Sequence, residues 1–173
     1  MNVPLPLRID RFPTPIGELV TVVDAEGRLR AIDWTDHEPR MMELLVRYCG
    51  KAGYILTPAR DPGGMRRALE AYFAGDLGAI DTLATETGGT DFQRRVWQEL
   101  RRIPHGGTIS YAELARRIGK PAAIRAAGLA NGANPVSIVI PCHRVIGSDG
   151  SLTGYGGGLH RKKWLLTHEG ALS

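Results

Sequence analysis

The stretch Ser110–Asn131, SYAELARRIGKPAAIRAAGLAN, decides how the second half of the chain folds. Ser110 is a favourable N-cap and Glu113 follows three residues later, as in a capping box, so a helix is predicted over Tyr111–Ile118. Gly119-Lys120-Pro121 predicts a turn, and the alanine-rich run after it predicts a second helix. Two short helices around such a turn are typical of a helix-turn-helix. Many helical hairpins touch no nucleic acid, so the pattern alone leaves a binding role open.

The second predicted helix, Ala122–Asn131, consists mostly of small residues. Ala126, Ala127 and Gly128 would let it approach a backbone or a groove closely. Arg125 is its one long basic side chain, and it is either a solvated surface cation or a group presented towards DNA.

Charge is distributed unevenly along the chain. The formal net charge is +4, but residues 1–91 hold ten Lys and Arg against fourteen Asp and Glu, whereas residues 92–173 hold twelve against four. The balance is therefore −4 in the first part and +8 in the second. A basic half of this kind suits a polyanion, and a well-solvated basic surface is the alternative.

A polar stretch with paired glycines separates two periodic parts of the chain. Thr85–Asp91, TETGGTD, predicts a linker. We therefore expect an N-terminal domain over residues 1–84 and a C-terminal domain over residues 92–173.

The first domain is predicted to be a small α+β unit. Leu19–Val23 and Leu29–Trp34 predict a hairpin across an Asp-Ala-Glu-Gly turn, with Ile9–Phe12 as a neighbouring strand. Helices are predicted over Arg40–Cys49 and Met65–Ala74.

The second domain is predicted to be mainly helical. Phe92–Ile103 has an apolar face and ends before a proline. Asp149-Gly150 predicts the turn of a hairpin or wing. Tyr155–Gly158, YGGG, predicts a loop in close approach to its surroundings. A last helix is predicted to end near Glu169.

The two cysteines and the lack of long apolar runs bear on the compartment. Two cysteines are too few for a disulfide framework, so both are expected as free thiols in a cytoplasmic protein without a membrane segment or signal peptide. Cys49 is expected to be a buried small apolar side chain on a helical stripe. That stripe comprises Met42, Leu45, Val46 and Cys49.

Cys142 lies in the stretch IPCHRV, residues 140–145, and has no such stripe. The preceding run Val136–Ile140, VSIVI, predicts a buried strand that would deliver Cys142 to the rim of a site. A thiol with a pKa of about 8.5 needs a neighbouring base or cation to react at neutral pH. His143 and Arg144 are adjacent candidates.

An acid that oriented His143 would complete a set of thiol, base and carboxylate. Glu169 is one of only four acidic residues in the basic part of the chain. Spacing alone leaves open whether Cys142 is a nucleophile or a buried structural thiol. Neither cysteine has the spacing of a zinc site, so no metal is predicted.

Several motifs together resemble a known family, the O6-alkylguanine-DNA alkyltransferases in their compact bacterial form. The motif IPCHRVIG is preceded by Asn134-Pro135 and followed by Gly154-Tyr155, Gly157-Gly158 and the pattern Trp-Leu-Leu-x-His-Glu-Gly at residues 164–170. TPIGELV and a helix that ends in Tyr-Phe-x-Gly resemble the family's N-terminal domain.

The resemblance implies a fold and an activity. The fold would be α+β, with a small N-terminal α/β domain of RNase H-like type and a mainly helical, winged helix-turn-helix-like C-terminal domain that carries the active site. The activity would be single-turnover repair by a suicide methylated-DNA–protein-cysteine methyltransferase. An alkyl group would pass irreversibly from O6-alkylguanine, and also from O4-alkylthymine, in duplex DNA to Cys142 after base flipping, without metal or cofactor.

The resemblance also implies roles for individual residues around Cys142. His143 would draw the thiol proton through a water, Glu169 would hold His143, and Asn134 would fix the turn that shapes the site. Tyr111 would assist extrusion of the base and protonate the leaving guanine.

The remaining implied roles concern DNA. Arg125 would fill the space left by the flipped base, on a helix that enters the minor groove through its small residues. The backbone of Val145 would recognise the base, and the loop of Tyr155, Gly156 and Gly157 would close over it. The protein is expected to be a monomer free in solution, with cooperative assembly on DNA left open.

Two other functions are compatible with these residues. A cysteine hydrolase built from Cys142, His143 and Glu169 would turn over repeatedly. A non-catalytic, alkyltransferase-like binder of DNA lesions is the second alternative, although such proteins replace the cysteine.

Overall fold

The computed structural model describes residues 3–173, and the chain divides into two compact units, Met1–Gly89 and Thr90–Ser173. The first and last residues of the stretch expected as a linker belong to regular structure. Thr85 forms a parallel bridge with Leu29, and Asp91 is the first residue of helix α3, Asp91–Leu100.

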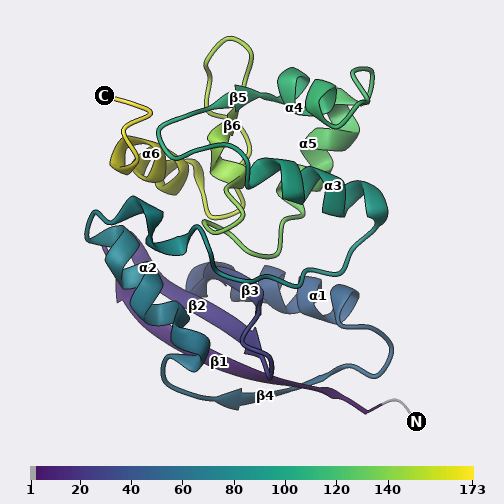
Figure 1. Cartoon of the computed structure of the whole chain (residues 1–173), viewed down its shortest axis with the longest axis vertical. Helices are drawn as coiled ribbons and strands as arrows, with labels where there is room; N and C mark the ends of the chain where they lie inside the picture. Colours follow the sequence, from purple (N-terminus) through teal and green to yellow (C-terminus); the bar gives the residue numbers. More distant parts are fainter. Residues whose placement is uncertain (1–2) are drawn as a thin grey trace. The chain divides into compact units, whose positions relative to one another are not determined.

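Unit 1 is built on a four-stranded sheet with the strand order β3-β2-β1-β4 (Figure 1). Strands β1, Leu5–Thr14, β2, Gly17–Asp24, and β3, Leu29–Trp34, are antiparallel neighbours, which confirms the predicted hairpin and its neighbouring strand. Strand β4, Tyr54–Pro58, pairs parallel with β1. The sequence analysis missed β4 because a five-residue edge strand carries little pattern.

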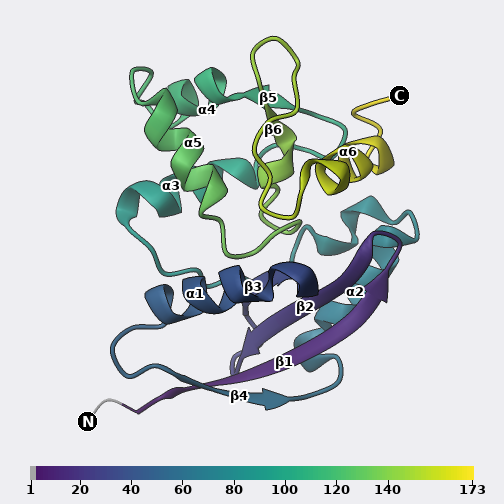
Figure 2. The same ribbon diagram turned by 180° about the vertical axis from the view of Figure 1, so that it is seen from behind.

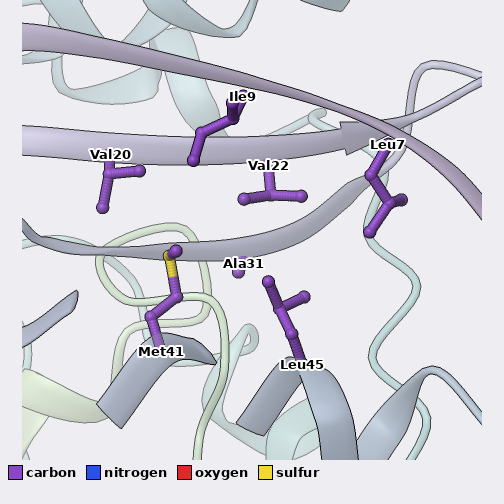
Figure 3. Packing of buried hydrophobic residues seen from close by; sticks show 7 residues of the cluster. All are labelled: Leu7, Ile9, Val20, Val22, Ala31, Met41 and Leu45. Carbon is purple, nitrogen blue, oxygen red and sulfur yellow. The ribbon is translucent and has the colours of Figure 1, made fainter. Parts of the chain in front are cut away.

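Two helices cover the opposite faces of this sheet, α1 over Glu38–Tyr48 and α2 over Met65–Phe73 (Figures 1 and 2). Figure 3 shows how α1 packs, with Met41 and Leu45 directed at the strands. The buried residues of this cluster are Leu7, Ile9, Val20, Val22, Ala31, Met41 and Leu45. Because both faces are covered, every residue of β2 from Leu19 to Asp24 is buried.

The predicted apolar stripe of α1 was wrong in part. Met41, Leu44 and Leu45 are the buried residues of the helix, whereas Val46 is 66% exposed and Cys49, beyond the helix end, is only half-buried. Leu45 belongs to two apolar stripes with helical spacing, the predicted one with Val46 and a second one with Met41. The sheet packs against the second stripe.

Unit 2 contains four α-helices and a pair of two-residue parallel strands (Figure 2). The helices that follow α3 are α4, Tyr111–Arg117, α5, Ile124–Gly132, and α6, Leu159–His168. The strands are β5, Ile109–Ser110, and β6, Val145–Ile146. The two helices predicted around the Gly119 turn are confirmed as α4 and α5, each shorter by one or two residues than expected at one end.

The start of α4 confirms the predicted N-cap but not the whole capping box. The Ser110 hydroxyl accepts a hydrogen bond from the Glu113 N–H at 3.0 Å. The Glu113 carboxylate binds Arg116 and Arg117 of its own helix instead. A complete capping box occurs at α3, between Thr90 and Gln93.

The segment Val136–Ile140 is buried but is not a strand, so this prediction was wrong. Ile138 has φ 74°, a left-handed conformation outside the range of regular strands, and the Ile140 N–H donates to the Val136 carbonyl at 3.0 Å, which makes a turn. The Asn134 side chain forms hydrogen bonds with two further backbone groups of the segment, the Val136 N–H and the Ile140 carbonyl. An apolar run indicates that a segment is buried but does not determine its backbone conformation, which here is a turn.

The predicted wing is present only as a turn. The Gly147 N–H donates to the Ser151 carbonyl at 2.9 Å, around Asp149-Gly150. No strand follows β6 in residues 147–158, where glycine and polar residues offer little surface to bury. Within residues 3–173, no helix is long and apolar enough to cross a membrane.

The packing of α1 leads to a stability prediction. Leu45→Ala removes a buried side chain and leaves a cavity, so it should lower the free energy of unfolding by about 2–5 kcal/mol. Val46→Ala, on the exposed side of the same helix, should change it by less than about 0.5 kcal/mol. Urea-induced unfolding followed by circular dichroism measures both, and a larger loss for Val46→Ala would contradict the observed stripe.

Candidate active site

Cys142 is the first residue of a 3-10 turn, η4, Cys142–Arg144, and is 7% exposed. Its N–H donates to the Ile140 carbonyl at 2.8 Å. Its own carbonyl accepts from the Asn131 side chain at 3.3 Å and from the Val145 N–H. The backbone of Cys142, which carries the thiol, is therefore held by hydrogen bonds at both its N–H and its carbonyl.

Two buried asparagines fix the approach to this turn. Asn134, 3% exposed, accepts from the Val136 N–H at 2.9 Å and donates to the Ile140 carbonyl at 2.7 Å. Asn131 belongs to α5 and reaches the Cys142 carbonyl. Sequence analysis identified Asn134 but missed Asn131, whose only signal is an amide at the end of an alanine-rich helix.

His143 and Glu169 form a buried pair, the contact that the family resemblance implied. His143 Nε2 lies 2.9 Å from Glu169 Oε2, and both side chains have no exposed surface. Burial lowers the pKa of His143, although the Glu169 carboxylate opposes this shift. Within the described residues, His143 Nδ1 is buried without a hydrogen-bond partner.

The guanidinium of Arg144, the second candidate beside the thiol, binds Glu169 and a backbone carbonyl. Arg144 Nε and Nη2 donate to the two carboxylate oxygens at 2.8 and 2.9 Å, and Nη1 donates to the Ile103 carbonyl at 2.6 Å. Burial opposes ionisation of Glu169, but His143 and Arg144 outweigh it and hold the pKa of this carboxyl well below its usual range.

Tyr111 begins α4 and is held by the loop that follows β6. Its hydroxyl donates to the Thr153 carbonyl at 3.0 Å. Burial raises the pKa of the phenol. Gly128 on α5 faces the ring, since a Cβ there would lie 3.6 Å from Tyr111 Cδ1.

Lys162 is a buried cation beside these groups, and sequence analysis missed it. It has no exposed surface, and its Nζ donates to the carbonyls of Val145 at 2.7 Å and Thr153 at 2.8 Å. Burial lowers the pKa of Lys162 to about 8. Its spacing of three and four residues from Leu165 and Leu166, both buried, was the available signal.

The residues expected to face DNA on α5 divide into exposed and buried ones. Arg125 and Ala126 are exposed, Gly128 is half-buried and Ala127 is buried. Arg125 is therefore a surface cation at the start of the helix, while Ala127 belongs to the helix's packed side.

The glycine loop before α6 is partly buried. Tyr155 and Gly156 are half-buried and Gly157 is buried, with its carbonyl accepting from the Arg161 guanidinium at 3.0 Å. The Gly158 N–H donates to the Tyr155 carbonyl at 2.9 Å, so the loop closes as a turn.

The predicted site residues thus form two sets, one connected around Cys142 and one exposed on the surface of α5. Hydrogen bonds link the turn at Cys142 with Asn134 and with the His143–Glu169 pair. Lys162 donates to the Val145 carbonyl, and its ammonium lies over the Tyr111 ring. Arg125 and Ala126 project from α5. In the part of the chain that the structure describes, no three His, Cys, Asp or Glu side chains gather as metal ligands.

Comparisons with known proteins cover nearly the whole chain. The model of the family described as 6-O-methylguanine DNA methyltransferase, DNA binding domain, matches residues 91–171. Methylated-DNA–protein-cysteine methyltransferases from Shigella flexneri and Salmonella typhimurium are 52% and 55% identical over 163 residues, which cover 94% of this chain and 95% of each relative.

Solved structures agree in fold with the mixed α/β architecture. The Mycobacterium tuberculosis O6-methylguanine methyltransferase has a TM-score of 0.77 at 39% identity, covering 95% of this chain and 93% of its own. The Mycobacterium tuberculosis protein OGT in complex with DNA has a TM-score of 0.77 at 40% identity, covering 96% and 94%.

The buried His143 leads to a pH prediction. Between its lowered pKa and the ordinary value of 6.5, the unfolded chain binds a proton at this residue and the folded protein does not. Stability should therefore fall as the pH drops below about 6.5.

Urea unfolding at pH 7.5 and pH 5.5 measures this loss. His143→Gln should lose less stability between the two pH values than the parent protein. His105→Gln, which replaces an exposed histidine of the same unit, should retain the parent's loss. An unchanged pH dependence in His143→Gln would show that His143 is not buried in its neutral form.

Proposed function

Since the chain belongs to the methylated-DNA–protein-cysteine methyltransferase family, we propose that Cys142 is the residue that accepts the alkyl group from DNA. The bond between the alkyl carbon and guanine O6 breaks, a carbon–sulfur bond forms at Cys142, and the guanine leaves with a proton. The observation that carries this assignment is the thiol on a turn whose next residue, His143, is held by a buried Glu169. The thioether persists, so each molecule acts once.

His143 prepares the thiol for attack. Its Nε2 is engaged by Glu169, which leaves Nδ1 to take the thiol proton through a bridging water. The buried carboxylate stabilises the imidazolium that forms. Arg144 keeps Glu169 ionised and therefore acts through that residue.

Asn134, Tyr111 and Val145 complete the reacting centre. Asn134 positions the backbone before Cys142 through its two hydrogen bonds. Tyr111 supplies a proton to the departing guanine, and the proton that His143 takes from the thiol restores the phenol, so the net proton transfer runs from Cys142 to the guanine. The backbone of Val145 and the loop of Tyr155, Gly156 and Gly157 recognise and cover the base.

The base must leave the duplex to reach Cys142, which is nearly buried. Flipping costs a few kcal/mol, and Arg125 offsets part of that cost by entering the space left behind. The small residues Ala126 and Gly128 let α5 enter the minor groove, whereas Ala127, expected there from the sequence, is buried on the packed side of the helix. The lesions include O4-alkylthymine as well as O6-alkylguanine.

Unit 2 acts as a winged helix-turn-helix in which the turn around Asp149-Gly150 serves as the wing. The sheet and helices of unit 1 form an RNase H-like domain over residues 1–84, joined to residues 92–173 by residues 85–91. The protein works as a cytoplasmic monomer that uses no metal or cofactor.

Mass spectrometry of the intact protein and its peptides tests the acceptor. After incubation with a duplex that contains O6-methylguanine, one methyl group should be found on Cys142 per molecule. Cys142→Ser should acquire none, while Cys49→Ser should react as the parent does. A methyl group on another residue, or none on Cys142, would overturn the assignment.

The same reaction separates the alternatives. Product formation that continues beyond one equivalent would indicate a cysteine hydrolase. Tight binding of the lesion without any transfer would indicate a non-catalytic binder.

Arg125→Ala tests the DNA-facing helix. Loss of the group that replaces the flipped base should slow repair of duplex DNA by roughly 10- to 100-fold, because flipping costs a few kcal/mol. Reaction with the free base O6-benzylguanine should change by less than about threefold. Arg102→Ala removes another exposed arginine of unit 2 and controls for the lost charge. Equal losses on duplex and free base would exclude an action of Arg125 through DNA.

A further inference from the structure

Helix α5 exposes two large apolar side chains beside Arg125. Ile124 is 43% exposed and Leu129 is 69% exposed, on a helix of nine residues. Single apolar residues on a surface are normal, whereas exposed apolar residues that gather on one face indicate an interaction site. In the function proposed above, Arg125 and the small residues of α5 meet DNA, and these two side chains have no role.

Helical spacing places both side chains on the face that carries Arg125. Each residue turns the helix by about 100°, so Ile124 and Leu129 lie on either side of Arg125 around the axis and about 140° apart. Gly128 and Gly132 fall between them, and a Cβ at Gly132 would meet no atom within 4 Å. Two apolar side chains and one cation therefore flank a strip of glycine backbone.

The charge of this face favours DNA as the surface that covers it. The helix Ile124–Gly132 holds Arg125 and no acidic residue, and it belongs to the basic part of the chain. The minor groove of duplex DNA offers a negative potential for the arginine and deoxyribose walls for the apolar side chains. Proteins that bind this groove insert leucine or isoleucine to unstack a base step.

We propose that Ile124 and Leu129 form an apolar wedge, which packs into the minor groove on both sides of Arg125 and loosens the stacking of the base to be flipped. The inference rests on the proposed function, in which α5 enters that groove. The wedge lowers the cost of flipping before Arg125 fills the gap. Its contribution to DNA affinity is independent of counterion release, and neither side chain touches the alkyl group.

Alanine at the two positions is the main test. Ile124→Ala and Leu129→Ala should each weaken the affinity for unmodified duplex by about three- to tenfold, because each removes apolar surface that is buried in the groove. The slope of log affinity against log salt concentration should equal the parent's, since the same phosphates are neutralised. Fluorescence anisotropy at several salt concentrations measures both quantities. Val46→Ala removes a similarly exposed apolar side chain from unit 1 and should bind as the parent does.

Two substitutions of similar size separate apolar contact from bulk. Leu129→Met keeps an apolar side chain and should retain the parent's affinity to within about twofold. Leu129→Gln has a polar end and should lose as much affinity as Leu129→Ala. Because the side chain is exposed, the melting temperatures of these variants should equal the parent's.

Transfer rates show whether the wedge acts on flipping. With O6-methylguanine in a duplex at concentrations below saturation, the double alanine variant should react roughly 10- to 100-fold more slowly, the product of the two single effects. Reaction with free O6-benzylguanine should change by less than about twofold. Equal losses on duplex and free base would assign both side chains to the structure of the site and exclude the wedge.

A duplex with 2-aminopurine beside the lesion reports unstacking directly, because this base fluoresces more strongly when it is unstacked. Binding by Cys142→Ser, which stops before transfer, should brighten the probe. The same protein with alanine at positions 124 and 129 should brighten it less at saturating protein. Equal brightening would exclude an action of the wedge on stacking.

The binding measurements can overturn the proposal in three further ways. Unchanged or tighter binding by the double alanine variant would exclude the wedge. A lower salt slope would mean that the two side chains act by placing charges near phosphates. A Leu129→Gln protein that binds as tightly as Leu129→Met would assign the effect to bulk.

The parent protein keeps this proposal distinct from the proposed function. If the parent transfers no methyl group to Cys142, the proposed function fails. If the parent transfers one equivalent and the double alanine variant binds and reacts as the parent does, only the wedge fails.

Discussion

The buried carboxylate of Glu169 is the group on which the site depends. Removing a carboxylate from water costs several kcal/mol, so it must be matched by partners with good geometry. One carboxylate oxygen of Glu169 is hydrogen-bonded to His143, and both oxygens accept hydrogen bonds from Arg144. Because these partners are consecutive residues of η4, satisfying one carboxylate orients the whole turn that begins at Cys142.

Helix α5 connects this turn to the surface proposed to meet DNA. At its start the helix presents Arg125 to solvent, and near its end Asn131 binds the carbonyl of Cys142. Trp97 of α3 donates to the Ala130 carbonyl at 2.8 Å and fixes the helix between these two points. A single rigid element thus sets the distance between the group that would replace a flipped base and the thiol that would react with it.

Features with local causes could be predicted from the sequence. The hairpin of β2 and β3 and the cap at Ser110 follow from turn residues and from a hydroxyl next to free N–H groups, and both were confirmed. The pairing of His143 with Glu169, 26 residues apart, has no local cause: composition only made Glu169 a candidate, and the family resemblance implied the contact.

Features that depend on tertiary contacts could not be predicted in the same way. The run Val136–Ile140 was read correctly as buried and wrongly as a strand, because hydrophobicity reports burial and leaves the backbone path open. The face of α1 was chosen by the sheet from two overlapping stripes. The sequence suggested Arg144 as a neighbour of the thiol and gave Lys162 no role, and only the fold shows the carboxylate and carbonyls that they bind.

Ile138 gives the segment before Cys142 an unusual energetic balance. A β-branched residue with a positive φ costs on the order of 1–3 kcal/mol, while burial of its side chain contributes about 1.5–3 kcal/mol, so the two terms nearly cancel. Glycine would relax the backbone and open a void, and a polar residue would keep the strain and lose the burial. Both kinds of substitution therefore lose one of the two terms without a gain that exceeds it, so a residue outside the reacting centre still limits which side chains this position accepts.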